Sequence, residues 1–294
     1  MKIKTIIALV LSAVFFAGTA GGKQPKICRL RVMSYNMLFE HKLPQEPERR
    51  WKSRCPNAVR DFQLNKPDIA GTQELQTFQV EEFLKKSGYE WCGVNLSKGG
   101  RDDRQSENEA IFFNPARVSL VKEGHIWFSE TPNVPGSYSW GMKYPRMCNW
   151  GKFKDKASGK EFYVFNSHFY VDGDKEEART EAAKLLLQNI HTLTQGSSFI
   201  VTGDLNATVS SPSICLLLND GSMKDSRAAV TDPKGPEGSF HGFGQFNPPK
   251  AALRIDHIFV SNNIRVDNYR IIDDQLGTGR WESDHLPVCV DLTF

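Results

Sequence analysis

The chain has 294 residues and a formal net charge of +3, and 39% of its residues are hydrophobic, including 19 phenylalanines. This length fits one large α/β domain or two ordinary ones, and the composition is that of a soluble globular protein with a large aromatic core. The near-balance of charges argues against a protein that follows long stretches of nucleic acid by neutralising phosphates, but it leaves room for a local basic patch.

The start of the chain has the pattern of a secretory signal peptide. Lys2 and Lys4 precede the apolar residues 6–16, and small residues follow at a cleavage position. A membrane anchor is the alternative, but the apolar run is shorter than the roughly 20 residues that cross a bilayer, so no transmembrane segment is expected. We therefore expect residues 1–20 to be a signal peptide, residues 21–294 to form one domain, and the protein to be exported, either to a periplasm or out of the cell.

Strand-like and helix-like segments alternate along the rest of the chain, without an internal repeat or a low-complexity linker. The N-terminal part predicts a strand at residues 29–37, a helix at 47–65, a strand at 69–75 and a helix at 77–86. Pro67 ends the first helix and Gly88 ends the second.

The middle of the chain predicts two β-hairpins and one long helix. The hairpins pair residues 110–113 with 118–128, and residues 147–154 with 161–168. Residues 174–194 give the clearest helix, because acidic residues fill its first turn and apolar residues recur along one face.

Apolar runs in the C-terminal part predict further strands at residues 199–202, 254–260, 264–272 and 286–292. Strands therefore outnumber helices, and many of them occur in hairpins. This pattern favours an α/β fold in which two mainly antiparallel β-sheets pack face to face with helices on the outside, a four-layer sandwich, over a simple parallel sheet.

The six cysteines all follow the predicted signal peptide, where disulfides are permitted. No Cys-x-x-Cys or Cys/His spacing indicates a zinc site. Cys92 and Cys289 lie in apolar runs, so a buried free thiol and a disulfide bridge both remain open for them.

Short polar clusters stand at the ends of several predicted strands. They are Ser34-Tyr35-Asn36-Met37, Thr72-Gln73-Glu74-Leu75, Asn166-Ser167-His168, Gly203-Asp204-Leu205-Asn206, Arg254-Ile255-Asp256 and Ser283-Asp284-His285. Gly203 lets the backbone approach a ligand closely. Asp204 and Asn206 are expected to point the same way, because strand side chains alternate with period two. Asp256 interrupts an apolar strand and needs a cationic or donor partner, for which His285 is the candidate.

Taken singly, each cluster is compatible with a solvated strand end. Together, in this order and approximate spacing, they resemble the endonuclease/exonuclease/phosphatase superfamily, which has the deoxyribonuclease-I-like fold. The resemblance covers essentially the whole mature chain. Residues 238–243, Gly-Ser-Phe-His-Gly-Phe, are also similar to a Gly-Thr-Phe-His-Gly-Phe loop of exported bacterial members.

The resemblance implies hydrolysis of a phosphoester with Mg²⁺ as cofactor, for which Mn²⁺ would substitute. Glu74 is then the main metal ligand, with Asn36 and Asp284 nearby. Mg²⁺ takes oxygen ligands and often uses only one or two carboxylates together with a substrate phosphate, so this set of residues suits it.

The resemblance also assigns the catalytic residues. Asp204 positions or deprotonates the attacking water, and Asn206 holds a phosphate oxygen. His285, oriented by Asp256, binds the scissile phosphate or acts as a general base, since a carboxylate behind an imidazole fixes its tautomer and favours its charged form. His168 stabilises the transition state or assists the leaving group.

Tyr170 departs from the family pattern, in which an acid stands two positions after this histidine. Either the phenol of Tyr170 contacts phosphate or ligand directly, or the acidic role is missing. The segment before Asp256 also lacks the Pro-Ala-Trp-x-Asp-Arg sequence of the inositol-phosphate phosphatases, which disfavours that branch.

Further candidates surround the expected site. Glu107 matches a family glutamate, and Arg146 is a candidate for a structural or phosphate-facing arginine. Bases or sugars could stack on rim aromatics, with ordinary packing as the alternative; the candidates are Trp127, Trp140, Phe243 and Trp281.

We therefore expect an exported Mg²⁺-dependent phosphodiesterase or phosphatase that acts by in-line attack of water. Small, glycan-linked or lipid-linked phosphoesters are favoured over nucleic acid because the charge is near neutral, which makes a secreted nuclease the first alternative. A binding module of the same fold that has lost its chemistry is the second, with Tyr170 as the feature in its favour. The expected partner is the phosphoester substrate, and the protein is expected to be a monomer.

Overall fold

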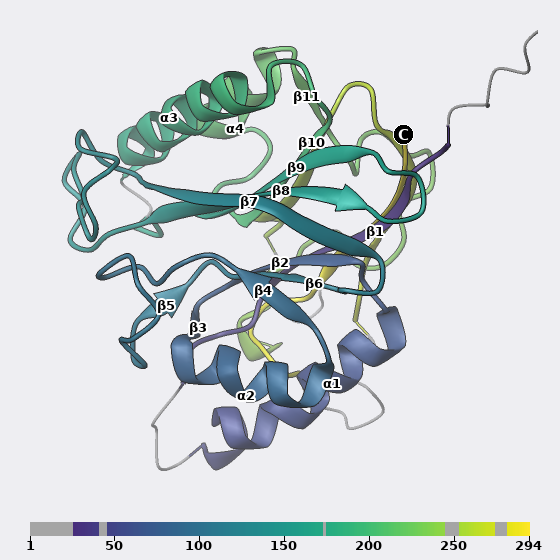
Figure 1. The fold of residues 1–294 in the computed structure, drawn as a ribbon. Helices are drawn as coiled ribbons and strands as arrows, with labels where there is room; N and C mark the ends of the chain where they lie inside the picture. Colours follow the sequence, from purple (N-terminus) through teal and green to yellow (C-terminus); the bar gives the residue numbers. More distant parts are fainter. Residues whose placement is uncertain (1–25, 41–45, 173–174, 245–252, 274–280) are drawn as a thin grey trace, which may run out of the picture.

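The computed structural model describes residues 26–40, 46–172, 175–244, 253–273 and 281–294. Two six-stranded sheets lie face to face between two layers of helices (Figure 1). Helices α1 (Trp51–Asn65) and α2 (Thr77–Ser87) cover the first sheet, and α3 (Glu176–Thr194) and α4 (Pro212–Asn219) cover the second. The four-layer α/β sandwich expected from the sequence is confirmed, while the predicted signal peptide lies outside the described residues.

The first sheet has the strand order β13-β14-β1-β2-β6-β4. Its strands are β1 (Arg29–Asn36), β2 (Ile69–Gln73), β4 (Glu90–Cys92), β6 (Ile111–Phe113), β13 (Arg265–Ile271) and β14 (Val288–Thr293). Only β1 and β2 run parallel within it, with Asn36 opposite Gln73 at their common end. The remaining pairs are antiparallel, so the last strand of the chain lies beside the first.

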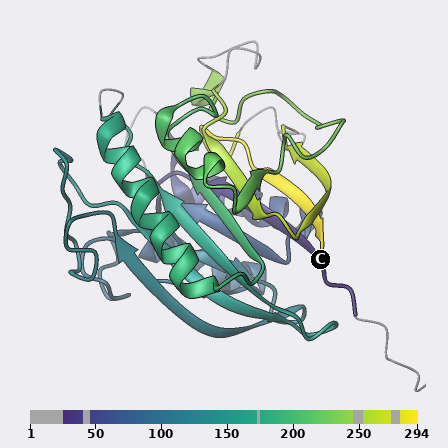
Figure 2. The ribbon, with the colours of Figure 1, turned by 90° about the horizontal axis from the view of Figure 1, so that it is seen from above.

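The second sheet has the strand order β11-β12-β10-β9-β8-β7. Its strands are β7 (Val118–Trp127), β8 (Met147–Asp155), β9 (Glu161–His168), β10 (Phe199–Asp204), β11 (Met223–Asp225) and β12 (Asp256–Ser261). Here β9 and β10 are the parallel pair, with His168 opposite Asp204. Seen from above, α3 lies over this sheet (Figure 2).

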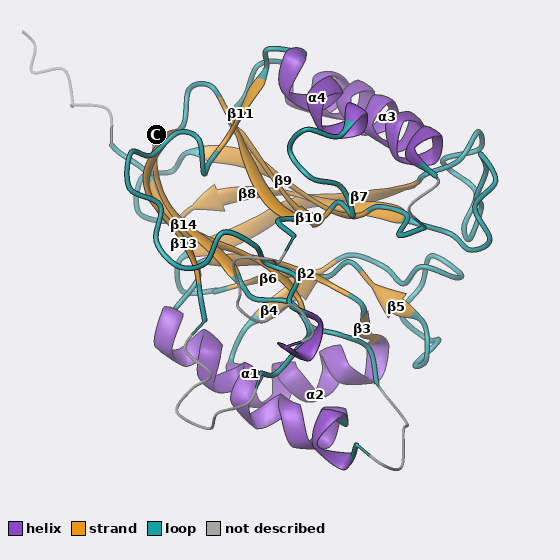
Figure 3. Cartoon of the chain, turned by 180° about the vertical axis from the view of Figure 1, so that it is seen from behind, coloured by secondary structure: helices purple, strands orange, loops and turns teal. Residues whose placement is uncertain are grey.

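Four short elements complete the described chain. Strands β3 (Leu75–Gln76) and β5 (Glu107–Asn108) form a separate two-stranded ladder beside the first sheet. The 3-10 turns are η1 (Pro47–Arg49) and η2 (Gly242–Gly244). Viewed from behind, the two helical layers lie on opposite outer sides of the paired sheets (Figure 3).

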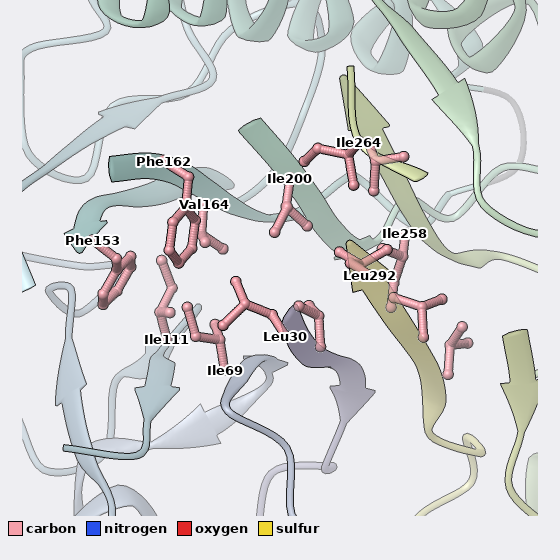
Figure 4. Close-up of a cluster of buried hydrophobic side chains, with 14 of the residues drawn as sticks. Leu30, Ile69, Ile111, Phe153, Phe162, Val164, Ile200, Ile258, Ile264 and Leu292 are labelled. Atoms are coloured by element: carbon pink, nitrogen blue, oxygen red, sulfur yellow. The ribbon is translucent and has the colours of Figure 1, made fainter. Parts of the chain in front are cut away.

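The space between the sheets is filled mostly by aliphatic side chains (Figure 4). Leu30 and Ile69 of the first sheet face Val164 and Ile200 of the second, and none of the four is more than 3% exposed. Burial of such a side chain contributes about 1.5–3 kcal/mol of transfer free energy. This core therefore holds the two sheets together and fixes the distance between the strand ends that carry the polar clusters.

A polar joint links the two sheets near those strand ends. Asn166 of β9 donates to the carbonyls of Thr72 (2.8 Å) and Ala110 (3.2 Å), and its Oδ1 accepts from Gln73 Nε2 at 2.7 Å. Gly71 makes this approach possible, because a Cβ there would lie 2.4 Å from Asn166 Oδ1. A buried network with these partners favours one register of the two sheets.

Most of the predicted elements are present, but one pairing is wrong. The predicted hairpin of residues 110–113 and 118–128 does not form, because β6 pairs in the first sheet and β7 in the second. The turn at residues 114–117 carries the chain from one sheet to the other instead of folding it back. The predicted helix at 47–65 is interrupted at Arg50, whose ψ of 145° is extended, and α1 begins at Trp51.

The pattern also missed β4, β5, α4 and β11, all of which are eight residues or shorter. All six cysteines are free thiols, which answers the question left open for Cys92 and Cys289. Among the helices of the described residues, none is long and apolar enough to cross a membrane.

Candidate active site

The polar clusters meet at one edge of the sandwich. The carboxyl ends of two parallel strands lie at the same edge of a sheet, and ligands of α/β proteins commonly bind there. Asn36 ends β1 beside the end of β2, and His168 ends β9 beside Asp204 at the end of β10. Each sheet therefore contributes one pair of parallel strand ends to the site.

A cavity of about 710 Å³ opens over these strand ends. Its polar residues are Glu74, Glu107, Arg146, His168, Asp204, Asn206, Asp284 and His285. Its mouth also includes Phe39, Val171 and Leu253, which are 36%, 49% and 48% exposed. Charged groups thus gather inside a cavity whose rim carries apolar side chains.

Asn36 joins the acidic groups of the two sheets. Its Nδ2 donates to Glu74 Oε1 at 2.9 Å and to Asp204 Oδ2 at 3.0 Å, while its Oδ1 accepts from the backbone of Leu38. Glu74 follows β2 with a left-handed φ of 67°, which turns the chain away from the strand. Burial raises the pKa of Glu74, and the nearby carboxylate of Asp284 raises it further.

Asp256 and His285 form a buried pair, which is the contact that the sequence predicted. His285 Nδ1 lies 2.8 Å from Asp256 Oδ2, and Ser239 donates to the same oxygen at 2.6 Å. Burial acts to lower the pKa of His285, but the carboxylates of Asp256 and Asp204 outweigh it and raise that pKa to about 10. His285 is therefore an imidazolium cation at neutral pH.

His168 has a different neighbourhood. Its Nδ1 lies 3.0 Å from Nη1 of Arg146, and its Nε2 lies 3.4 Å from Asp204 Oδ2. Burial lowers the pKa of His168 well below its usual value, and the positive charges of Arg146 and His285 lower it further. His168 is therefore neutral at neutral pH.

Asp204 lies between the two histidines. Its Oδ2 is 3.4 Å from His168 Nε2 and 3.6 Å from His285 Nε2, and its Oδ1 accepts from the backbone of Asn206 at 3.0 Å. Burial raises the pKa of Asp204 to about 6, with the charge of Asp256 adding to the rise. A carboxylate poised near neutral pH suits a general base.

Asn206 reaches the site by a route that the sequence did not predict. Strand β10 ends at Asp204, and Asn206 has a left-handed φ of 46°. Its Nδ2 donates to the carbonyl of Phe169 and lies 3.1 Å from His168 Nε2. A turn, rather than strand alternation, therefore brings Asn206 to the same side as Asp204.

The oxygen ligands at the cavity suit a hard divalent cation. Single ligand atoms of Glu74, His168 and Asp204 lie within 4.8 Å of one another, as do those of Asp204, Asp256 and His285. In the second group Nδ1 of His285 lies 2.8 Å from Asp256 Oδ2, so these two ligand atoms are already engaged with each other. Glu74 and Asp284 both line the cavity, and as oxygen donors they fit Mg²⁺ better than the imidazoles do.

Tyr170 lies apart from these residues. It is 1% exposed, its hydroxyl donates to Asp172 Oδ2 at 3.0 Å, and that hydroxyl accepts from the backbone of Lys143. It does not line the cavity over the described residues. Its ring packs against Tyr144, 4.7 Å between centroids, so the structure gives it a packing role.

The four candidate rim aromatics do not line the cavity either, within the described chain. Trp127 is fully buried and donates to the carbonyl of Leu96. Trp281 packs against His241 with 4.5 Å between centroids and 45° between the ring planes, and Phe243 lies under the guanidinium of Arg49. The aromatics that do line the cavity are Phe39, Tyr144 and Phe240.

The partner of His168 was not predicted from the sequence. Arg146 was a candidate for a structural or phosphate-facing arginine, but not for a neighbour of His168. The hairpin of β8 and β9 pairs Cys148 with Ser167, so continuing that register sets Met147 opposite His168 and Arg146 one residue beyond it. Hairpin register therefore brings Arg146 near the end of β9 but does not predict its contact with His168.

The fold and this cavity define a metal-dependent phosphohydrolase built on an α/β sandwich. The model of the endonuclease/exonuclease/phosphatase family matches residues 33–285, and the chain belongs to that family. The neighbours described next agree with this assignment over almost the whole chain.

Two solved structures from Bacteroides thetaiotaomicron are similar to this chain. A protein of the endonuclease/exonuclease/phosphatase family is 32% identical with a TM-score of 0.83, covering 92% of this chain and 99% of that one. A mannosyl-6-phosphatase is 33% identical with a TM-score of 0.81, covering 90% of this chain and 100% of that one. An uncharacterized protein of Acanthamoeba polyphaga mimivirus is 27% identical over 277 residues, 89% of this chain and 99% of the relative.

Proposed function

We propose that this protein is an exported Mg²⁺-dependent phosphatase that hydrolyses sugar phosphomonoesters, including those at the ends of glycans. The observation that carries the hydrolytic chemistry is the placement of Asp204 between a neutral and a cationic histidine in the cavity. The choice of a sugar phosphate rests on the likeness to the mannosyl-6-phosphatase, which spans nearly the whole of both chains.

In this proposal Asp204 receives the proton of the attacking water. The water oxygen forms the new bond to phosphorus while the bond from phosphorus to the sugar oxygen breaks, and the departing sugar oxygen takes up a proton from solvent to become a hydroxyl. The pKa of Asp204, raised to about 6 by burial, leaves its carboxylate ionised at neutral pH yet basic enough to accept the proton.

His285 holds the phosphoryl group during this step. Its charge, maintained by Asp256, offsets negative charge on the equatorial oxygens of the transition state. The amide of Asn206 supplies a further donor at the same side of the cavity. These groups are fixed before substrate arrives, so little reorganisation is needed at the moment of reaction.

Glu74 and Asp284 would hold Mg²⁺, with the amide of Asn36 keeping Glu74 in place. When bound, the ion supplies positive charge that neutralises the phosphoryl oxygens, and Mn²⁺ is expected to substitute. The export of the protein is proposed from the basic start and apolar run of residues 1–20. We also propose that it acts as a monomer.

The test is an assay of the mature protein with four substrates. They are mannose 6-phosphate, a chromogenic phosphomonoester, a chromogenic phosphodiester and plasmid DNA, each with Mg²⁺, with Mn²⁺ and with EDTA. His285→Ala is the matched inactive variant, and His191→Ala, an exposed histidine on α3, is the control.

EDTA-sensitive release of phosphate from mannose 6-phosphate that is lost in His285→Ala supports the proposal. Preference for the phosphodiester would make the protein a diesterase, and preference for DNA would make it a nuclease. No metal-dependent cleavage of any substrate would favour the binding module that has lost its chemistry.

A further inference from the structure

The two ring nitrogens of His168 face groups of opposite character. Nη1 of Arg146 lies 3.0 Å from Nδ1, whereas Asp204 Oδ2 lies 3.4 Å from Nε2. A guanidinium has five donors and no acceptor, so it can only donate to an imidazole nitrogen. Nδ1 must then offer its lone pair, and in a neutral ring Nε2 carries the proton.

Asn206 does not alter this conclusion. Its Nδ2 lies 3.1 Å from Nε2 of His168, but it also donates to the carbonyl of Phe169 at 3.0 Å. Both neighbours cannot donate to one neutral ring, because one of its nitrogens keeps a proton. The amide nitrogen has another acceptor, whereas Arg146 has nothing to accept with, so Nδ1 is the nitrogen that accepts.

The guanidinium of Arg146 is itself held on several sides. Its side chain is 8% exposed, its Nη1 lies 3.5 Å from Glu107 Oε2, and its carbon lies 5.0 Å from the ring centroid of Tyr144. Glu109 lies close enough to interact with its charge and is fully buried, and neither of its carboxyl oxygens has a hydrogen-bond partner among the described residues. Arg146 is thus the cation for two acidic groups as well as the donor to His168.

Two other states of His168 conflict with this geometry. A doubly protonated ring, or a neutral ring with its proton on Nδ1, would set an N–H group against the N–H of Arg146 at 3.0 Å. Two like donors at that distance repel each other, and the buried N–H on Nδ1 would face a donor in place of an acceptor. Turning the ring over about its Cβ–Cγ bond would place Cδ2 at the arginine and Cε1 at Asp204, so both nitrogen contacts would be lost.

We propose that Arg146 is a positioning residue that locks His168 in the neutral tautomer with its proton on Nε2. His168 then serves as a hydrogen-bond donor to a phosphoryl oxygen in the cavity. It does not remove a proton from water, because Nδ1, the nitrogen that could accept it, is occupied by Arg146. It does not protonate the leaving group either, because the N–H of a neutral imidazole is a very weak acid. This assignment chooses between the two roles that the sequence left open for His168.

The kinetic part of this inference rests on the proposed function, but its spectroscopic part does not. The tautomer can be read from long-range ¹H–¹⁵N correlations of the ring in histidine-labelled protein loaded with Mg²⁺, at about pH 7, where both neutral tautomers and the cation are in principle accessible. The His168 signals are identified by their loss in His168→Gln. The tautomer of His168 can therefore be determined even if the protein has no phosphatase activity.

Three variants give the expected pattern. The wild type should show a proton on Nε2 and none on Nδ1 of His168. Arg146→Met should release the lock and give mixed or cationic signals, and Arg146→Lys, which keeps a donor, should restore part of the wild-type pattern. Arg254→Met is the matched control, because Arg254 contacts Nδ1 of His257 at 3.3 Å and should change only that ring.

A double-mutant cycle supplies the kinetic readout. Arg146→Met should lower kcat by about 10- to 100-fold, the usual loss for a residue that orients a catalytic group. In a His168→Ala background the same change should have little further effect. A merely structural arginine would reduce activity by the same factor in both backgrounds.

The proposal is overturned if wild-type His168 carries a proton on Nδ1, alone or together with Nε2. It is also overturned if the losses from Arg146→Met and His168→Ala multiply independently. If Arg146→Met does not fold, the wild-type spectrum and the Arg146→Lys variant decide the question.

Discussion

His285 and His168 flank the same carboxylate, yet the structure gives them opposite electrostatic surroundings. His285 Nδ1 lies 2.8 Å from a buried carboxylate, and His168 Nδ1 lies 3.0 Å from a buried guanidinium. One partner stabilises a cation, and the other stabilises a neutral ring. The chemistry of each histidine is therefore set by the residue behind it rather than by its own place at a strand end.

The two histidines also differ in which sheets hold them and their partners. His168 ends β9 in the second sheet, while His285 stands before β14 of the first sheet and takes its partner Asp256 from β12 of the second. The cationic pair thus bridges the sheets, and its geometry depends on how they are joined. This comparison suggests which changes should damage the site most.

The largest effect is expected from removing the cation. His285→Ala should lower kcat/KM by about 10³-fold and His168→Ala by about 10²-fold, within the range measured for loss of one preorganised donor. The loss is larger for His285→Ala because His285 supplies a full positive charge, whereas His168 supplies only a hydrogen bond. Steady-state kinetics of both variants on one phosphomonoester measures the two losses in kcat/KM. Equal losses would contradict the different roles given to the two histidines.

Asp256→Asn tests the charge of His285 through stability. It should lower the free energy of unfolding by about 3 kcal/mol, as for a buried ion pair that loses one partner. The folded pKa of His285, about 10, exceeds its ordinary value of 6.5, so the pair stabilises fully below 6.5 and its contribution is lost as the pH rises to about 10.

Denaturant unfolding of both proteins at several pH values makes the comparison. The difference in free energy of unfolding between wild type and Asp256→Asn should become smaller as the pH rises from 6.5 to about 10. A difference that stays constant over this range would mean that Asp256 does not raise the pKa of His285.

Asn166→Ala tests the joint between the sheets that carry the two histidines. It removes the donor to the Thr72 carbonyl and the acceptor for Gln73, and leaves both partners buried. The expected loss is about 2 kcal/mol in the free energy of unfolding. Asn189→Ala, on the partly exposed side of α3, is the control and should change stability by no more than about 0.5 kcal/mol.

Glu109→Gln should have the smallest effect on the free energy of unfolding, and that effect should be least below about pH 4.5, where Glu109 is protonated in both the folded and the unfolded protein. Burial raises the pKa of Glu109 to about 8, although the charge of Arg146 opposes the rise, so the side chain is mostly protonated at neutral pH and glutamine mimics it. In the wild type, the contribution of Glu109 to the free energy of unfolding is greatest below its ordinary pKa of 4.5, and this contribution is lost as the pH rises through about 8.

Thermal unfolding across that pH range checks the prediction for Glu109. The unfolding temperature of Glu109→Gln should rise relative to that of the wild type as the pH rises. A strongly destabilised Glu109→Gln at every pH would mean that an ionised Glu109 is needed to hold Arg146.

The sequence predicted the layers and the polar strand ends because both depend on local pattern. Hydrophobic period defines the strands, and Asn36, Glu74, His168 and Asp204 stand within one residue of a strand end. The predicted hairpin at residues 110–128 was wrong because the local sequence does not distinguish a turn that pairs two neighbouring strands from a turn that leads the chain to the other sheet. Both strands contribute to the core between the sheets, but on their outer faces β6 buries Phe112 in the cluster under α1 and α2, and β7 buries Ile126 in the cluster under α3.

The sequence allowed the partner of His285 to be predicted, but not the partner of His168, so the charge of only one of the two histidines could be inferred from it. Asp256 was identified as needing a donor because an acid in an apolar strand is costly, and that reasoning led to His285. Arg146 gave no such signal, since an arginine at the start of a strand is ordinary on a protein surface. Its burial against Tyr144 and Glu107 is a tertiary fact, and it changes how His168 behaves.

Neutron diffraction from a crystal of the deuterated protein at about neutral pH would test the account most directly, because it locates the protons on both rings in one measurement. The account predicts deuterium on both nitrogens of His285 and only on Nε2 of His168. Two rings with the same protonation, or deuterium on Nδ1 of His168 facing Arg146, would contradict it.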